Sequence, residues 1–328
     1  MELSIIIVNW NSTHDLRKCV ASILGSPQKL STQLIVIDSG SHDGCDRMLC
    51  ESYPDVTFIQ SASNIGFAAA NNLACERATG ETLVFLNPDT EVMGPALTTL
   101  HQRLHSLPRA GIVGPTLVNS DGTVQSSCVQ AFPTILNQCL NSEWLRRRWP
   151  RSRLWGMPPA TEEEDGAREV EAVSGACLMV KRAAFQAVGR FAEEFFMYAE
   201  DVDLAYRIRQ AGYGTYYVPE ARVVHHGGNS SIQAENSFAA VMQTEATSRF
   251  LRKTRGQAYA TTYRISMLLT ALGRLFLLSA ASVPRGRRHR MAQLAKWRAV
   301  LRWALSRDPI VQRYYGPKDA AAAYGLRT

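Results

Sequence analysis

The chain has 328 residues, which is enough for one large domain with an appendage or for two domains. An apolar fraction of 46% and a charged fraction of 20% exclude a largely disordered chain. Its seven cysteines are scattered, without a CxxC pair, which argues against a disulfide framework or a zinc site and favours reduced thiols in the cytosol.

The net charge of +7 is unevenly distributed along the chain. Residues 249–313 include fifteen Lys or Arg and a single acid, Asp308, so the rest of the chain carries a charge of −7. A basic C-terminal part suggests nucleic acid or an anionic membrane surface as a partner.

The first hundred residues alternate between two kinds of pattern. Short runs rich in Ile, Val and Leu predict strands over 3–10, 34–38, 56–60 and 82–87. Helical spacing between these runs predicts helices over 13–24, 43–52 and 66–79. Repeated βα units of this length predict an α/β fold with a mostly parallel sheet and helices on both faces. No GxGxxG motif follows the first strand, so the dinucleotide fingerprint of a dehydrogenase is missing.

The pattern loosens after a further strand predicted over 112–118. Residues 144–166 are rich in Arg, Trp, Pro and Glu, and they predict a long surface loop or lid. Regular elements return from residue 170, with a helix over 200–210 and strands over 213–218 and 221–224. We expect the first domain to end near Ser231.

The C-terminal part combines apolar runs with cations. A helix is predicted over 234–253, and an apolar run over 265–283 is interrupted by Arg274, which is costly inside a membrane-spanning helix. Further basic residues follow, with Trp297 and Trp303 among them. This composition favours helices that lie in a membrane interface, while a re-entrant or spanning segment and a soluble helical cap remain alternatives.

The N-terminal apolar run is too short for a signal peptide. It covers residues 3–8 and is followed at once by Asn9 and Asn11. We therefore expect the N-terminal part of the chain to stay in the cytosol.

Polar residues follow the predicted strands, at the edge where ligands gather in open α/β sheets. Asp38 ends the second strand and could accept a hydrogen bond from a pyrimidine base or a ribose, although an Asx turn explains it equally well. Residues 64–67 open a helix that suits either a phosphate or simple packing. After the fourth strand, Asp89 could hold a metal on a nucleotide diphosphate or cap a helix, with Asn87 offering an amide oxygen.

Two acids at a helix start and a histidine pair complete the candidates. Glu200 and Asp201 begin the predicted helix, where a carboxylate could take the proton of an attacking hydroxyl or simply form an acidic first turn. Asp203 could be a helix-start residue. His225, followed by His226, could ligate Mn²⁺ or donate to a phosphate, although a lone histidine is more often structural.

Taken in order, seven segments resemble the inverting glycosyltransferases of family 2, which have the GT-A fold. They are residues 5–11, 38–44, 64–67, 87–89, 175–179, 196–204 and 225–228. Where the family usually has Asp-x-Asp, this chain has Asn87-Pro88-Asp89. That variant is similar to the rhamnosyltransferase-like branch, which builds cell-surface polysaccharide.

The resemblance implies a domain organisation and a site. A GT-A catalytic domain would cover 1–231, with a nucleotide-binding half over about 1–115 and an acceptor half over 116–231, and a basic amphipathic helical tail over 232–328. Asp201 would be the general base, and Asp89 and His225 would hold Mg²⁺ or Mn²⁺. The donor would be bound by Asn9, Asp38, Asn64, Gly66, Phe67 and Asn87. The acceptor side would comprise Gly175, Ala176 and Glu200.

The resemblance also implies a reaction and a location. A sugar would pass with inversion from a nucleotide-diphospho-sugar, with dTDP-L-rhamnose favoured, to a saccharide acceptor linked to polyprenyl diphosphate. The tail would hold the enzyme peripherally on the inner face of the cell membrane, and no nucleic-acid partner is expected.

Three rival interpretations were weighed against this one. A sugar nucleotidyltransferase normally has a Gly-rich loop with Arg or Lys after the first strand, which residues 9–12 do not provide. A nucleic-acid-binding protein would use Trp297 and Trp303 for stacking, but leaves the acidic body unexplained. A catalytically inactive scaffold is suggested by Asn87 and opposed by Asp89, Asp201 and His225.

Overall fold

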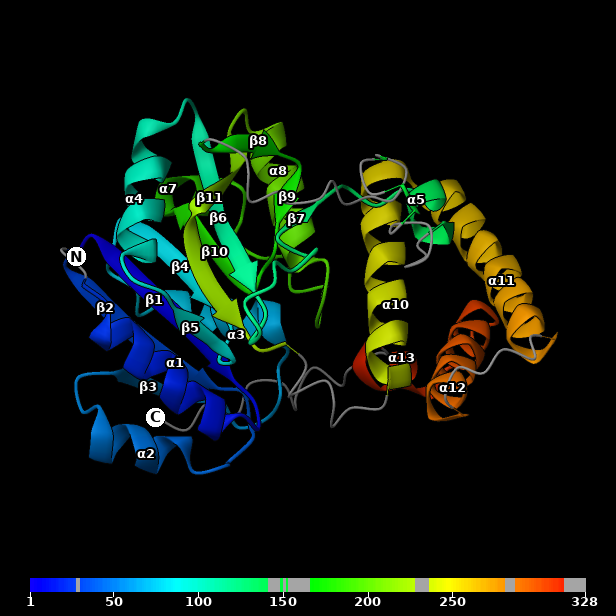
Figure 1. Ribbon diagram of the computed structural model, residues 1–328, viewed down its shortest axis with the longest axis horizontal. Coiled ribbons are helices and arrows are strands. Elements are labelled where there is room, and N and C mark those ends of the chain that lie inside the picture. Colours follow the sequence, from blue (N-terminus) through cyan, green and yellow to red (C-terminus); the bar gives the residue numbers. More distant parts are fainter. Residues whose placement is uncertain are drawn as a thin grey trace.

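The computed structural model describes residues 1–27, 30–140, 148–149, 152, 166–227, 236–280 and 287–315. Two parts lie side by side in Figure 1, a sheet covered by helices and a group of C-terminal helices. The predicted loop over 144–166 lies almost entirely outside the described residues, and so does the predicted domain end near Ser231.

A nine-stranded sheet forms the centre of the first part, with the order β3-β2-β1-β4-β10-β6-β11-β5 and with β8 paired to β11. Its strands are β1 (Leu3–Asn9), β2 (Thr32–Asp38), β3 (Thr57–Gln60), β4 (Thr82–Leu86), β5 (Thr90–Val92), β6 (Ala110–Val118), β8 (Arg168–Val170), β10 (Cys177–Lys181) and β11 (Gly214–His225). A separate two-stranded sheet pairs β7 (Val129–Gln130) with β9 (Ala172–Val173).

Helices cover both faces of the sheet, as predicted (Figure 1). Those of the first part are α1 (Thr13–Gly25), α2 (Cys45–Ser52), α3 (Phe67–Cys75), α4 (Ala96–Ser106), α7 (Arg182–Ala187) and α8 (Glu200–Gln210). The short helix α5 (Ile135–Cys139) lies apart from the sheet and packs against the C-terminal helix α11 (Gln257–Ala280) (Figure 1). Alternate residues of β1 enter two different cores, because successive side chains of a strand point to opposite faces. Ile5 and Ile7 pack with α1, α2 and α4, whereas Ile6 and Val8 belong to the cluster that contains α3 and α8.

The sheet is mixed, and the prediction of a mostly parallel sheet was wrong for its second half. β1, β2, β3 and β4 pair in parallel, as do β6 and β11, but β10 is antiparallel to both β4 and β6. The chain leaves β6 at Val118, adds the short strand β8 against β11, and then enters β10 at Cys177, whose Cα pairs with Leu86 at the end of β4. Because it re-enters from the carboxyl edge of the parallel strands, β10 has to run in the opposite direction.

The remaining predicted elements agree with the structure at the level of strands and helices. The strands predicted over 213–218 and 221–224 form one strand, β11, whose register shifts between Val218 and Arg222 around Pro219. A proline has no N–H for a ladder and is tolerated at such an irregularity. No prediction was made for β5 or α7, which are short, or for α4, although Leu97, Leu100 and Leu104 have helical spacing there.

Four helices form the second part. They are α10 (Asn236–Arg255), α11 (Gln257–Ala280), α12 (Arg287–Ala304) and α13 (Pro309–Tyr315). Their apolar residues, including Phe250, Tyr263 and Trp303, belong to the same buried cluster as Phe195 and Val202 of the first part. None of the described helices is long and apolar enough to cross a membrane.

The two tail tryptophans do not face outward, which corrects the sequence interpretation of both. Trp303 is fully buried, and its Nε1 donates to Glu245 Oε2 at 2.9 Å. Trp297 is partly buried against the core with the Arg274 guanidinium 5.7 Å from its ring centroid. The interfacial placement of these rings, and the base stacking of the rejected nucleic-acid alternative, rested on composition alone, which does not show which face of a helix packs inward.

Candidate active site

A cavity of about 520 Å³ opens beside the carboxyl ends of β1 and β4 and the start of α8. Ten of the twelve predicted site residues line it, namely Asn64, Gly66, Phe67, Asn87, Asp89, Gly175, Ala176, Glu200, Asp201 and His225. The expectation that these distant segments share one site is therefore met for all but Asn9 and Asp38.

Asn9 and Asp38 lie behind the cavity wall, and both are fully buried. The Asp38 carboxylate accepts hydrogen bonds from Asn9 Nδ2 at 2.9 Å and Gln60 Nε2 at 2.7 Å, and from the backbone N–H of Ser41 at 3.1 Å. A carboxylate so fully engaged holds its own loop in shape. The chain neighbours Trp10 and Ser39 line the cavity instead.

Ser39 connects this loop to residues 64–67. Its hydroxyl donates to Asn64 Oδ1 at 3.3 Å and accepts from the Ile65 N–H at 3.2 Å, while Asn64 Oδ1 also accepts from the Gly66 N–H at 3.0 Å. Gly66 has a φ of +85°, and a Cβ there would lie 2.5 Å from the carbonyl oxygen of Phe196. Only glycine fits here, because any side chain would collide with the backbone of Phe196. Ser39 therefore joins the loop after β2 to the segment that begins α3.

Asp89 and His225 face each other across the cavity edge. Asp89 is 6% exposed, and its Oδ1 lies 3.4 Å from His225 Nε2. The backbone ties the two segments together, because the His226 N–H donates to the Asp89 carbonyl at 2.9 Å. Asn87 N–H donates to the Ala176 carbonyl at 2.9 Å, which fixes this turn against the start of β10.

Gln125, which the sequence did not single out, determines the tautomer of His225. Its Nε2 is 2.7 Å from the His225 carbonyl and 2.9 Å from Asn119 Oδ1, both of which can only accept. Its Oε1 must then face His225 Nδ1 at 2.9 Å, so Nδ1 carries the proton. In the neutral ring, His225 Nε2 therefore presents a lone pair to Asp89, and two facing acceptors repel unless a proton or a cation lies between them.

Asp201 is held from three sides at the start of α8. Its Oδ2 accepts from the Gly175 N–H at 2.8 Å and from Gln130 Nε2 at 3.1 Å, and its Oδ1 accepts from the Val202 N–H at 2.8 Å. A Cβ on Gly175 would lie 3.2 Å from Asp201 Oδ2, so a small residue lets the carboxylate reach the backbone. Burial raises the pKa of Asp201 despite these hydrogen bonds.

Glu200 lies next to Asp201 and is also buried. Burial, followed by the negative charge of Asp201, raises the pKa of Glu200 well above its ordinary value. Its Oε2 finds no hydrogen-bond partner among the described residues. The turn before it is left-handed at Tyr198 (φ 70°) and Ala199 (φ 62°), which places both acids on the cavity side of the helix start.

Asp203, the third acid of this segment, points away from the chemistry. It is fully buried and forms ion pairs with Arg207 at 2.7 Å and with Lys253 of α10 at 2.9 Å. Its role is structural, as the helix-start interpretation anticipated, and it fixes α8 to the C-terminal helices.

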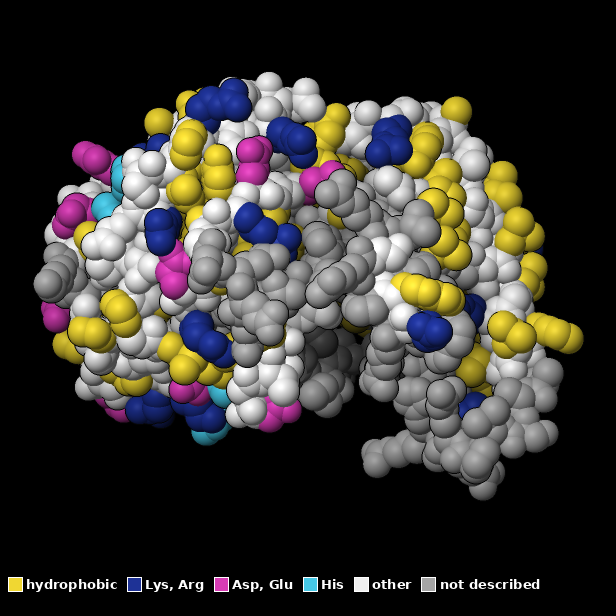
Figure 2. Space-filling model, turned by 45° about the horizontal axis from the view of Figure 1, so that its top comes forward, with side chains coloured by type: hydrophobic (Ala, Val, Ile, Leu, Met, Phe, Trp, Pro, Cys, Tyr) yellow, Lys and Arg dark blue, Asp and Glu magenta, His cyan; other side chains and the backbone are white. Residues whose placement is uncertain are grey.

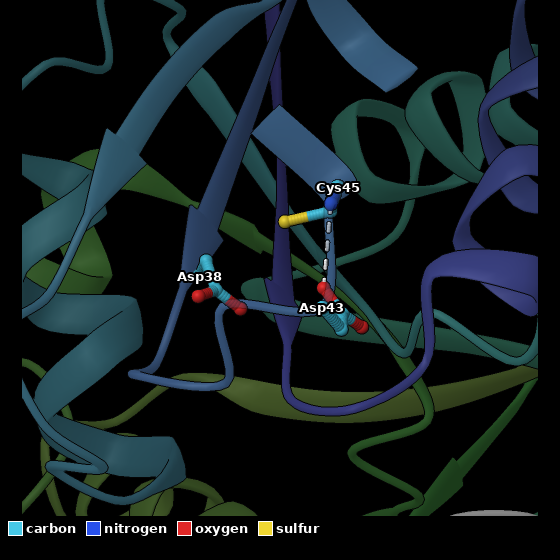
Figure 3. A group of neighbouring side chains, drawn as sticks. All are labelled: Asp38, Asp43 and Cys45. Atoms are coloured by element: carbon cyan, nitrogen blue, oxygen red, sulfur yellow. Dashed lines mark hydrogen bonds between the residues drawn. The ribbon is translucent and has the colours of Figure 1, made fainter. Parts of the chain in front are cut away.

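A second group of possible metal ligands, Asp38, Asp43 and Cys45, lies at the end of β2 and the start of α2 (Figure 3). Asp43 accepts hydrogen bonds from the Thr13 N–H at 3.0 Å and from Asn9 Nδ2 at 3.2 Å. Burial and the charges of Asp38 and Asp43 raise the pKa of the Cys45 thiol, and a protonated thiol is a poor metal ligand. We therefore interpret this group as the support of the loop between β2 and α2.

The described cavity lining is rich in acids and lacks Lys and Arg. Asp89, Glu200 and Asp201 contribute carboxylates, and His225 is the only other titratable group apart from a tyrosine. A diphosphate entering this cavity would meet no cationic side chain among the described lining residues.

Comparisons with known proteins show the family of the chain. The model of "Glycosyl transferase family 2" matches residues 4–189, and that of "Glycosyl transferase family group 2" matches residues 164–306, which includes α10, α11 and α12. N-acetylglucosaminyl-diphospho-decaprenol L-rhamnosyltransferase of Mycobacterium tuberculosis is 30% identical over 240 residues, covering 70% of this chain and 77% of that protein. Rhamnosyltransferase WbbL of Escherichia coli is 24% identical over 219 residues, covering 64% and 78%.

The fold is shared with a solved sugar-nucleotide enzyme. Mannosyltransferase PcManGT from Pyrobaculum calidifontis, solved in complex with GDP-Man and Mn²⁺, superposes with a TM-score of 0.57 at 16% identity, covering 93% of this chain and 86% of that one. The predicted GT-A-like α/β architecture is thereby confirmed. The chain belongs to glycosyltransferase family 2, and it is a hexosyltransferase of the rhamnosyltransferase-like type.

Proposed function

We propose that the chain transfers L-rhamnose with inversion from dTDP-L-rhamnose to an N-acetylhexosaminyl diphospho-polyprenol. The observation that carries this proposal is that one cavity has carboxylates at two separate places. Asp89 lies beside His225, and Asp201 is held by Gly175 and Gln130. Rhamnose as the transferred sugar is suggested by both rhamnosyltransferase relatives, and the acceptor by the Mycobacterium tuberculosis enzyme. The dTDP carrier follows from the resemblance to the rhamnosyltransferase-like branch.

Asp89 and His225 would hold Mg²⁺ or Mn²⁺. The facing lone pairs of Asp89 Oδ1 and His225 Nε2 fit a divalent cation, and carboxylate with imidazole is a donor set that Mn²⁺ accepts. When bound, the ion would neutralise the leaving nucleoside diphosphate, which the described lining cannot do by itself because it contains no Lys or Arg.

Asp201 would act as the general base. As the acceptor hydroxyl oxygen bonds to the anomeric carbon, the bond from that carbon to the diphosphate breaks, and Asp201 takes the hydroxyl proton. Gly175 and Gln130 orient the carboxylate, while its raised pKa makes it a stronger base than an ordinary aspartate.

The nucleotide would lie against the loops after β1, β2 and β3. Asn64, Gly66, Phe67 and Asn87 line this side of the cavity, and the Asn9–Asp38 network behind it holds the loop that presents Ser39. We assign Asn9 and Asp38 an indirect part in donor binding, through the shape of that loop.

The reaction is tested with detergent-purified full-length protein. Release of nucleoside diphosphate is measured with Mn²⁺ or Mg²⁺ across dTDP-L-rhamnose, UDP-sugars and GDP-mannose, together with a short-chain N-acetylglucosaminyl diphospho-lipid. Metal-dependent turnover of dTDP-L-rhamnose that is lost in Asp201→Asn is expected. Turnover of another donor would correct the sugar, and silence across the panel would favour the inactive scaffold.

We further propose that α11 rests on an anionic membrane at the inner face of the cell. Its inward face, with Tyr263, Met267 and Ala271, is buried in the molecule. Its opposite side exposes a second apolar stripe, here called the outer stripe: Ile265, Leu269, Leu272, Phe276 and Leu277. Hydrophobic side chains line the edge of the molecule on the side of α11 in Figure 2, with Lys and Arg among them on the same face.

A helix that is apolar on two sides, in a part of the chain with a strong excess of cations, fits a lipid surface that bears negative charge. The double variant Leu269→Glu with Phe276→Glu should lose co-sedimentation with phosphatidylglycerol vesicles. The matched control, Gln102→Glu with Gln312→Glu, adds the same charge at exposed positions outside the stripe and should keep it. Equal binding of both variants would refute the placement.

A further inference from the structure

We propose that Gln138 and Gln243 form a subsite for an uncharged saccharide, the sugar moiety of the acceptor, between the catalytic part and the C-terminal helices. This inference rests on the proposed transferase function and adds residues that the family motifs do not contain. Both side chains line the active-site cavity, Gln138 from α5 and Gln243 from α10.

The subsite adjoins the proposed base through a third amide. Gln130 of β7 also lines the cavity, and its Nε2 donates to Asp201 Oδ2 at 3.1 Å, which leaves its Oε1 for another donor. Gln138 Nε2 donates to Asn137 Oδ1 at 3.1 Å. The Oε1 of Gln138 can then accept a hydrogen bond from a ligand. The neighbouring elements β7 and α5 and the distant helix α10 therefore bring three amides to one cavity.

Both helices that carry the outer amides are held in place, although the Gln243 side chain itself is exposed. α5 begins with a capping box, in which Thr134 Oγ1 accepts from the Asn137 N–H at 3.1 Å and Asn137 Oδ1 accepts from the Thr134 N–H at 2.9 Å. The ion pair of Lys253 with Asp203 fixes α10 to the catalytic helix α8 at 2.9 Å. Because both helices are already held in place, their backbone loses little conformational entropy when a ligand binds.

The chemistry of this wall selects the class of ligand. A primary amide both donates and accepts, which matches the hydroxyl and acetamido groups of a sugar. The described lining offers no cation for a phosphate, so the diphosphate and lipid of the acceptor would extend out of the cavity. Ala131 and Pro133 add small apolar surface beside the amides, as in other mixed ligand sites.

The experiment measures both binding and turnover of a short-chain N-acetylglucosaminyl diphospho-lipid with the full chain. Gln138→Ala and Gln243→Ala should each raise the acceptor Kd and KM about 3- to 10-fold, and the double variant about 10- to 100-fold, since each removes a neutral hydrogen bond. The KM for dTDP-L-rhamnose and its slow hydrolysis without acceptor should not change. Gln312→Ala, exposed on α13 and outside the cavity, is the matched control.

The outcomes separate this inference from the function on which it rests. If the wild type transfers rhamnose and the double variant has an unchanged acceptor Kd, the subsite is refuted and the function stands. If donor and acceptor parameters worsen together, the two glutamines support the fold and the subsite is again refuted. If the wild type neither binds the probe nor turns over any donor, both proposals fall.

Discussion

Replacing Gln125 with Met tests whether a side chain outside the cavity tunes the proposed metal site. The substitution keeps similar volume but removes the acceptor for His225 Nδ1–H and the donor to the His225 carbonyl. Without Oε1, the ring is free to carry its proton on Nε2, the atom that faces Asp89. Loss of partners of this kind typically lowers metal affinity about 10- to 100-fold, equivalent to about 1.4–2.7 kcal/mol.

The structure explains why the upper part of this range is reasonable. The hydrogen bond to Nδ1 selects the tautomer, and a neutral hydrogen bond is worth about 0.5–1.5 kcal/mol, which alone accounts for up to about tenfold. The second bond, from the same amide to the His225 carbonyl at 2.7 Å, fixes the backbone that carries the ring. Both are lost together in Gln125→Met, whereas Gln125→Glu keeps an acceptor for Nδ1–H.

The assay is a Mn²⁺ titration followed by electron paramagnetic resonance, in the presence of dTDP. Nitrogen chemical shifts of His225 report the tautomer independently of activity. We expect weak Mn²⁺ binding in Gln125→Met, substantial recovery in Gln125→Glu, and wild-type affinity in Gln102→Met, an exposed position on α4. If His225→Ala weakens Mn²⁺ binding and Gln125→Met does not, the reasoning about Gln125 is refuted while the metal site stands.

Four further predictions concern the acids and one glycine. Asp201→Asn should abolish transfer but leave the Kd for dTDP within about twofold, by calorimetry; retained turnover would exclude Asp201 as the base. In the wild type, transfer should decline as pH falls through the raised pKa of Asp201, because the base becomes protonated. Glu200→Gln should stabilise the fold more at pH 7.5 than at pH 5. As pH rises above about 4.5, Glu200 of the wild type loses its proton in the unfolded state but keeps it in the folded state, so the free energy of unfolding of the wild type falls, and glutamine removes this effect. An equal change in thermal midpoint at both pH values would contradict this. Gly66→Ala should weaken donor binding more than tenfold or prevent folding, since its Cβ would lie 2.5 Å from the Phe196 carbonyl; unchanged dTDP affinity would show that the loop can move.

Much of the site could be predicted because parallel strands deliver their carboxyl ends to one edge. The apolar runs located β1, β2 and β4 closely, so the residues after each strand were expected to converge, and Asn87 and Asp89 do line the cavity. The acids at the start of α8 were also found, since a helix with a buried face has a recognisable beginning. These inferences depend on local periodicity, which the sequence shows directly.

The supporting residues could not be found by the same reasoning. Gln125 and Gln130 lie in a segment with no periodic pattern, and their importance arises from contacts with residues 100 and 71 positions away. The inward orientation of Asp38 depends on Asn9 and Gln60, which belong to two other strands. The reversal of β10 follows from the path of the chain after β6, and its apolar run gives no sign of direction.

The composition of the C-terminal helices overstates how many of their cations are available for contact with a membrane. Lys253 is paired with Asp203 and Glu194, and Arg249 with Glu245, while Arg264 and Arg274 lie over tryptophan rings. These cations hold the helices to each other and to the catalytic part, so they are not free to meet a membrane. The apolar outer stripe of α11 then becomes the main candidate for lipid contact, with the remaining exposed cations in a supporting role. The same inward contacts place Gln243 at the active-site cavity, which makes the tail a wall of the site as well as a proposed anchor.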